Sequence, residues 1–136
     1  MATASAFMDM AASADEVWDL IGGFNSLPDW LPAVVKSELS DGGRLRHLET
    51  ADGVVIVERL QTFDHAGKVY SYSISEGPFP VSDYLATLKV ESRGDGARVT
   101  WSSVFKAKGV TEQEAEALFT TMYQGGVETL SKHFCS

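Results

Sequence analysis

Residues 111–134, TEQEAEALFTTMYQGGVETLSKHF, decide the fold of this chain. Thr111 is followed three residues later by Glu114, which is the capping-box signature of a helix start. Apolar residues then recur at helical spacing, at Ala115, Leu118, Phe119, Met122, Tyr123, Gly126, Leu130 and His133 or Phe134. We therefore expect one long helix whose apolar face needs a large partner surface.

The preceding segment, from Val34 to about Lys106, predicts that surface. Apolar and polar residues alternate within three runs, at 70–75, 84–91 and 99–105, as they do in strands with one covered face. Turn signals recur at Asp41–Gly43, Asp52–Gly53, His65–Gly67, Gly77–Pro78 and Gly94–Gly96. Such regular spacing is typical of an antiparallel meander, and the final helix is the only element long enough to cover it.

The first thirty residues add one strand and two short helices. Residues 4–10 are a strand candidate, and Ser13 with Glu16 forms a second capping box before a helix that ends at Gly22–Gly23. The stretch FNSLPDWLP (24–32) follows, with room for one helical turn. We therefore predict an α+β fold in one domain, 1–136, in which a seven-stranded curved antiparallel sheet wraps around the long C-terminal helix and two short helices follow the first strand.

Composition limits the classes of partner. A chain of 136 residues is long enough for a real core, and its formal net charge of −8 argues against nucleic acid and against an anionic membrane surface. The expected partner is a small uncharged molecule or another protein, and a homodimer is compatible with the sequence.

Cysteine usage and the N-terminus bear on the compartment. Cys135 is the only cysteine, so no disulfide can form within one chain, which fits a reducing compartment. The N-terminus has no basic region of the kind that opens a signal peptide, and no stretch is as apolar as a membrane span. We expect a cytoplasmic protein without membrane insertion.

The sequence carries no strong catalytic motif. His47, His65 and His133 lie far apart, and none has a partner at metal-ligand spacing. Phosphate-binding loops and nucleophile elbows are missing as well. We expect neither a metal nor a cofactor.

The best polar signal is Arg46 with Glu58. A three-residue hairpin loop with Gly53 in the left-handed conformation would pair Thr50 with Val54, Leu48 with Ile56 and Arg46 with Glu58. Because Leu48, Ile56 and Leu60 are apolar, this face is expected to point inward together with the ion pair. The alternative is that Val55, Val57 and Phe63 are covered, which would leave a surface pair worth about 0–1 kcal/mol.

Several aromatic residues suggest a cavity between sheet and helix. Tyr72, Phe79, Tyr84, Trp101, Phe105 and Met122 are expected to line it, with Gly126 on its roof, because a mid-helix glycine removes volume. The alternatives are that the aromatic residues are plain core and that Gly126 allows close helix–sheet packing.

The segment 24–32 raises a separate question, because its two prolines bracket two costly apolar side chains. We expect Trp30 and Leu31 to face Phe79 across the cavity entrance, so that residues 26–32 and the loop 77–81 act as a gate. The alternative is that Trp30 is buried permanently against the first helix, near Trp18.

The chain resembles a known superfamily from about residue 5 to residue 134. The marks are Trp30-Leu31-Pro32, Arg46, Glu58-Arg59-Leu60, Tyr70-Ser71-Tyr72, Pro80 with Tyr84, and Val99-Thr100-Trp101. They are similar to those of the START-like and birch-pollen-allergen-like helix-grip proteins, and most of all to those of the bacterial polyketide cyclase/dehydrase family. The resemblance implies the helix-grip fold, and it singles out Arg46 and Glu58.

The resemblance leaves the activity open, because fold alone does not determine function. The first hypothesis is binding of a small hydrophobic molecule, aromatic, polyketide-like or lipid-like, in an enclosed cavity lined by Trp30, Leu31, Arg46, Leu48, Ile56, Glu58, Tyr72, Phe79, Tyr84, Trp101, Phe105, Met122 and Gly126. The second is a cyclase or dehydratase in which Glu58 is acid or base, Arg46 tunes it, and Tyr72 or Tyr84 polarises a carbonyl. A third is a protein-interaction module that uses the open sheet edge or the segment 24–32 around Trp30.

Overall fold

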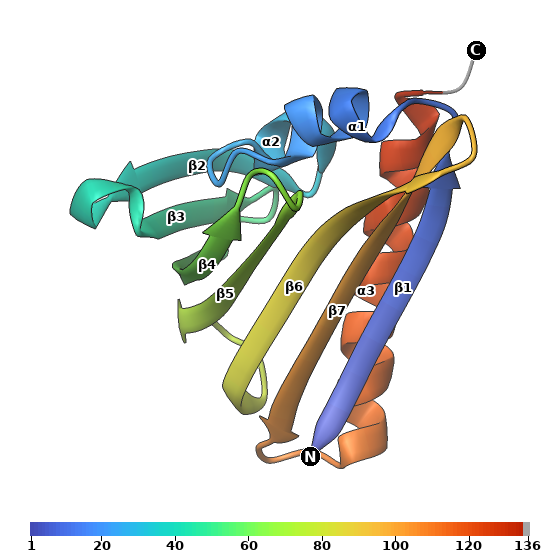
Figure 1. The fold of residues 1–136 in the computed structure, drawn as a ribbon. Helices are drawn as coiled ribbons and strands as arrows, with labels where there is room; N and C mark the ends of the chain where they lie inside the picture. Colours follow the sequence, from blue (N-terminus) through green and yellow to red (C-terminus); the bar gives the residue numbers. More distant parts are fainter. Residues whose placement is uncertain (135–136) are drawn as a thin grey trace.

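The computed structural model describes residues 1–134, which form one sheet, three α-helices and a short 3-10 turn (Figure 1). In chain order the elements are β1 (Ala2–Met10), α1 (Ala14–Ile21), α2 (Leu27–Trp30), β2 (Val34–Ser40), η1 (Asp41–Gly43), β3 (Leu45–Thr50), β4 (Val55–Asp64), β5 (Val69–Glu76), β6 (Val81–Arg93), β7 (Gly96–Ala107) and α3 (Glu112–Lys132). Cys135 lies outside the described residues.

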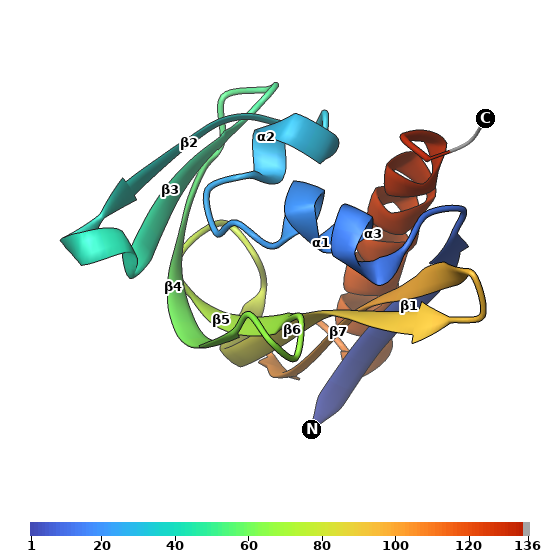
Figure 2. The same ribbon diagram turned by 45° about the horizontal axis from the view of Figure 1, so that its top comes forward.

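All seven strands belong to a single antiparallel sheet in the order β1-β7-β6-β5-β4-β3-β2. The predicted meander is therefore confirmed, with the N-terminal strand added beside β7. The sheet curves so strongly that β2 and β3 swing away from β1 and β7 (Figure 2). The predicted seven-stranded helix-grip architecture is confirmed.

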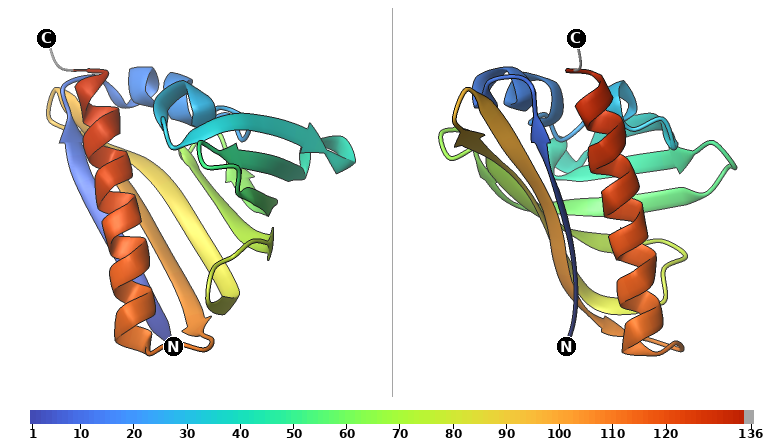
Figure 3. Two further views of the ribbon diagram at one scale, coloured as in Figure 1. Left: turned by 180° about the vertical axis from the view of Figure 1, so that it is seen from behind. Right: turned by 90° about the vertical axis from the view of Figure 1, so that its right-hand side faces the viewer.

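Helix α3 lies along β1 and β7, at one edge of the concave face (Figure 3). Its predicted capping box is present, since Thr111 Oγ1 accepts from the Glu114 amide and the Glu114 carboxylate accepts from the Thr111 amide. Ala115, Phe119, Tyr123, Gly126, Val127 and Leu130 form its buried face. Leu118, which we predicted on that face, is 40% exposed, because helical spacing alone does not tell the centre of an apolar stripe from its edge.

Small side chains in β1 allow the close approach of α3. Ala2, Ala4 and Ala6 alternate with exposed residues and are at most 5% exposed themselves. Since alanine places only a methyl group between strand and helix, the backbones can pack closely. The narrowest part of the interior therefore lies at this edge of the sheet.

The two short helices close one end of the concave side (Figure 2). Helix α1 starts where the Ser13 hydroxyl accepts from the Glu16 amide, and Pro28 occupies the first turn of α2, where a missing N–H costs nothing. Trp18 on α1 donates from Nε1 to His65 Nδ1, 2.9 Å away, in the turn after β4. None of the helices in the described part is long and apolar enough to cross a membrane.

Candidate functional site

The β3–β4 hairpin brings Arg46 and Glu58 face to face on the concave side. The strand register pairs Arg46 with Glu58 and Leu48 with Ile56, and Gly53 has φ +86° in the loop, so the predicted hairpin is confirmed. Arg46 is fully buried and Glu58 is 7% exposed. Of the residues that the alternative parity would cover, Val55 and Phe63 are 55% and 47% exposed, and only Val57, beside a register irregularity in β4, is buried. The ion pair therefore points inward.

Arg46 is held from several sides. Its Nε donates to Glu58 Oε1 at 2.8 Å, and its Nη2 lies 2.7 Å from the same oxygen as an ion-pair contact outside hydrogen-bond geometry. Nη1 donates to the Phe24 carbonyl at 2.9 Å and to the Tyr70 hydroxyl at 3.3 Å. The guanidinium also lies 4.2 Å from the centre of the Phe24 ring. Arg46 is thus fixed in place and lies behind Glu58.

Burial and the neighbouring groups shift the pKa values of both members of the ion pair. Burial raises the pKa of the Glu58 carboxyl, and the Arg46 cation opposes that rise. Burial lowers the pKa of Arg46, but Tyr70, Glu58 and Tyr72 outweigh it, so the net shift is upward. Arg46 therefore stays a cation at any ordinary pH.

Glu58 reaches a small internal cavity of about 60 Å³. Both contacts with Arg46 use Oε1, and within residues 1–134 the second oxygen, Oε2, has no hydrogen-bond partner. The cavity is lined mainly by apolar and aromatic side chains. Its predicted members are Leu31, Leu48, Ile56, Glu58, Tyr72, Phe79, Tyr84, Trp101 and Met122.

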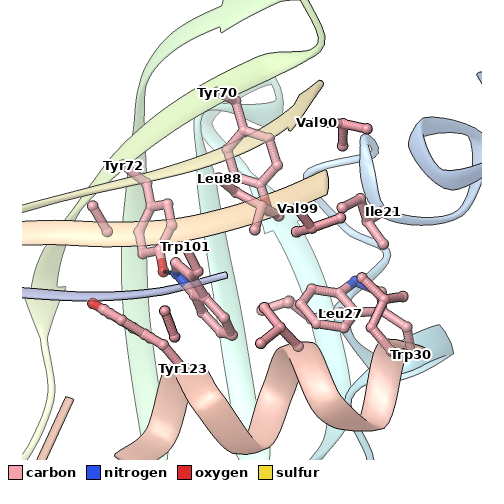
Figure 4. Packing of buried hydrophobic residues seen from close by; sticks show 14 of the residues in the cluster. Ile21, Leu27, Trp30, Tyr70, Tyr72, Leu88, Val90, Val99, Trp101 and Tyr123 are labelled. Atoms are coloured by element: carbon pink, nitrogen blue, oxygen red, sulfur yellow. Dashed lines mark hydrogen bonds between the residues drawn. The ribbon is translucent and has the colours of Figure 1, made fainter. Parts of the chain in front are cut away.

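A linked group of four aromatic side chains, Tyr72, Trp101, Tyr123 and Tyr84, also lines this cavity. Trp101 donates from Nε1 to the Tyr72 hydroxyl at 2.9 Å, and its ring stacks on Tyr123 with centroids 4.6 Å apart (Figure 4). The hydroxyl groups of Tyr84 and Tyr123 bond to each other. Burial raises the pKa of Tyr72 and Tyr84 well above the ordinary value, and that of Tyr123 to about 12. All three tyrosines are therefore neutral near pH 7.

A larger groove of about 570 Å³ lies next to the cavity, between α3 and the β3–β4 hairpin. Leu31, Val34, Ile56, Phe79 and Met122 line both spaces, so the two are contiguous. Thr121, Gly125 and Thr129 form the helix side of the groove, and Pro32, Thr50 and Val54 lie opposite. The space between sheet and helix is therefore a narrow inner cavity joined to an open groove.

Gly126 lines the groove, as predicted, but it does not leave the empty volume that we expected. Its backbone borders the groove, but a Cβ at this position would lie 2.7 Å from Cζ3 of Trp101 and 3.4 Å from Cδ1 of Leu31. Gly126 thus allows α3 to pack closely on Trp101 and does not roof an empty space. The open position is its neighbour Gly125, where a Cβ would meet nothing within 4 Å.

Trp30 and Phe105 were also misplaced. Trp30 is 1% exposed and packs edge-on against Trp101, with ring centroids 5.7 Å apart, so it is part of the core and lines neither space (Figure 4). The alternative had named Trp18 as its neighbour, but its aromatic contact is Trp101. Phe105 is fully buried between Tyr84 and Phe119. Leu31 and Phe79 do border the groove, so the proposed entrance keeps those two members.

The structure adds residues that we did not predict. Val34, Ile74, Phe119 and Tyr123 line the inner cavity. Phe119 and Tyr123 were visible in the helical periodicity, but a contact between α3 and β6 depends on sheet curvature. Nothing in the sequence marks Thr121 and Thr129 as groove residues. Among residues 1–134, no cluster of three or more His, Cys, Asp and Glu side chains is placed to hold a metal ion.

The chain matches a known protein family over almost its whole length. Residues 1–134 match the family described as "Polyketide cyclase / dehydrase and lipid transport". The chain belongs to this family. The predicted family membership is thereby confirmed, and a search of curated protein sequences found no significant match.

Several solved structures resemble the chain over nearly its whole length. XoxI from Bacillus cereus shares 43% sequence identity, with 98% of this chain and 96% of that one covered at a TM-score of 0.96. A START superfamily protein from Mycobacterium smegmatis is 15% identical. The match covers 97% of this chain and 96% of that one, at a TM-score of 0.79. Norcoclaurine synthase from Thalictrum flavum, solved with dopamine and hydroxybenzaldehyde, is 25% identical. The match covers 96% of this chain and 84% of that one, at a TM-score of 0.73.

Proposed function

We propose that the protein binds a small hydrophobic molecule, aromatic or polyketide-like, between the sheet and α3. One observation carries the proposal: an apolar groove of about 570 Å³ continues into an inner cavity that ends at the carboxylate of Glu58. Ligand sites of this kind combine an apolar lining with a few polar groups that fix orientation. The hydrophobic body would lie in the groove, and its polar end would point toward Glu58.

The relatives support this class of ligand. The family description names lipid transport and polyketide cyclisation, and norcoclaurine synthase was solved with two aromatic molecules bound. The formal charge of −8 disfavours an anionic ligand. A neutral aromatic molecule agrees with all three observations.

The test blocks the groove without disturbing the core. Gly125→Trp places a large side chain into open space on α3, so it is expected to abolish binding of 2-naphthol in equilibrium dialysis while thermal stability is retained. Thr120→Trp is the matched control, because Thr120 is exposed on the same helix but outside the groove. Equal binding by both variants and the unmodified protein would refute the groove as the site.

A second candidate function is catalysis of the cyclase or dehydratase type. The unpartnered Oε2 of Glu58 favours it, because a carboxylate beside an apolar cavity can remove a proton next to a carbonyl and return it to a departing hydroxyl. Arg46 would act through Glu58, since it is fully buried behind it. The test uses 2,6-heptanedione, whose intramolecular aldol condensation gives 3-methylcyclohex-2-enone and water. Catalysis should be lost in Glu58→Gln, and an unchanged rate in that variant would exclude the role.

A further inference from the structure

The inner cavity contains one hydrogen-bond acceptor without a donor. Oε1 of Glu58 receives both contacts from Arg46, and Oε2 has no partner within the described part of the chain. Arg46 is a buried cation, and its contacts with Glu58 use Oε1 alone. In the ion pair with Arg46, Glu58 is a carboxylate, and Oε2 can only accept.

The same cavity contains a donor without an acceptor, on Tyr72. The indole N–H of Trp101 can only donate, so the Tyr72 oxygen accepts that bond at 2.9 Å. Over residues 1–134 the structure gives the hydroxyl hydrogen of Tyr72 no acceptor. Tyr72 is only 2% exposed and lines the cavity together with Glu58. A bound molecule is the available partner for both groups.

The size of the cavity limits what can reach them. Its volume of about 60 Å³ is roughly a tenth of the 570 Å³ of the adjoining groove. A single functional group fits there, whereas a ring system has to remain in the adjoining groove. The group that enters must donate to a carboxylate oxygen and accept from a phenol.

Building on the proposed function, we infer that the ligand enters with a hydroxyl group first, as a phenol, enol or alcohol, which donates to Glu58 Oε2 and accepts from the Tyr72 hydroxyl. A ketone offers no donor to Oε2, and a carboxylate would face a second negative charge. Arg46 positions Glu58 and turns its free oxygen toward the ligand. The site therefore selects hydroxyl head groups over carbonyl and carboxylate head groups.

The test compares probes that share one ring system. Equilibrium dialysis near neutral pH would measure 2-naphthol, 2-fluoronaphthalene, 2-acetylnaphthalene and 2-naphthoate. A hydrogen bond to a charged group contributes about 1.5–3 kcal/mol, so 2-naphthol is expected to bind roughly ten- to a hundredfold more tightly than 2-fluoronaphthalene. Tyr72→Phe should weaken the binding of 2-naphthol by roughly two- to tenfold and leave that of 2-fluoronaphthalene unchanged.

Glu58→Gln gives the decisive change of preference. Because Arg46 has only donors, the amide oxygen of glutamine has to stay on Arg46, and the amide NH₂ takes the place of Oε2. The variant should lose the preference for 2-naphthol and bind 2-acetylnaphthalene more tightly than the unmodified protein does. Glu49→Gln is the matched control, because Glu49 is exposed on the same hairpin.

The outcomes separate this inference from the proposed function. If all four probes bind the unmodified protein within about threefold of one another, the hydroxyl preference is refuted while the groove remains a binding site. If none of them binds, both proposals fail. If Glu58→Gln does not fold, the ranking of the four probes on the unmodified protein still decides the inference.

Discussion

The two sides of the concave face differ in how closely α3 approaches them. Along β1, the inward residues Ala2, Ala4 and Ala6 let the helix pack tightly. Along β3 and β4 the inward residues are large or charged, and a groove of about 570 Å³ separates the hairpin from the helix. The same sheet thus provides a packed edge and an open edge.

The contrast shows how a single sheet and helix combine stability with a binding space. Apolar burial against α3 is concentrated in β1 and β7, where it holds the fold together. The buried ion pair lies on the other side, where it stabilises little but fixes a carboxylate at the end of a cavity. Each edge can therefore be tested by substitutions that should leave the other intact.

The largest effect is expected from Trp30→Ala, which removes a side chain on the packed side. Trp30 is 1% exposed against Trp101, so the free energy of unfolding should fall by about 3–5 kcal/mol, as for other large core truncations. Urea denaturation measures the change. Phe79→Ala at the groove is the comparison. Because Phe79 is only half-buried, this substitution should lower the free energy of unfolding by clearly less. Equal losses in both variants would contradict the division into two edges.

The neighbouring glycines of α3 should respond with opposite signs. In Gly126→Ala the new methyl group would crowd Trp101, and overpacking costs about 1–3 kcal/mol, more than the ~1 kcal/mol that alanine gains over glycine in a helix. Gly125→Ala faces open space and should raise the free energy of unfolding by up to about 1 kcal/mol. Urea denaturation of the two variants gives the comparison. If both substitutions stabilise the protein, the Trp101 side chain can move aside to accommodate the new methyl group, and the expected opposite signs are refuted.

The subtlest effect is a pH dependence at the open edge. Burial raises the pKa of Glu58 despite Arg46, so the folded protein holds this proton more tightly than the unfolded chain does. The resulting stability is fully present below the ordinary value of 4.5 and is lost as the pH rises through the folded pKa. Arg46 and Tyr72 titrate only at much higher pH.

Glu58→Gln isolates this contribution. The free energy of unfolding of the unmodified protein, minus that of the variant, should decrease as the pH rises from about 4.5. Urea denaturation over a pH series measures it, with Glu49→Gln as control. A difference that increases with pH would show that attraction to Arg46 outweighs the cost of burial.

Local signals in the sequence predicted the fold well. The capping boxes at Ser13 and Thr111, the alternation within the strands and the turn at Gly53 depend on neighbouring residues, and each is present. The inward Arg46–Glu58 pair followed from the length of one hairpin loop. These features need no knowledge of how distant segments meet.

The candidate site was harder to predict, because it depends on how the sheet bends. Gly126 signals missing volume in the sequence, yet the indole of Trp101 from β7 fills that volume. Trp30 was predicted at the cavity entrance, but it is buried against the same indole. Both errors arise from one long-range contact that periodicity cannot reveal.

The position of β1 at the end of the sheet also bears on how the chain folds during synthesis. Ala2 pairs with Phe105, and in the described sheet the only strand beside β1 is β7. Strand β1 therefore finds its neighbour only after β2 to β6 have been translated, and α3 emerges later still. Contacts so distant in sequence slow folding. Until then, the alanine-rich strand remains an unpaired edge that a nascent chain has to keep from associating with others.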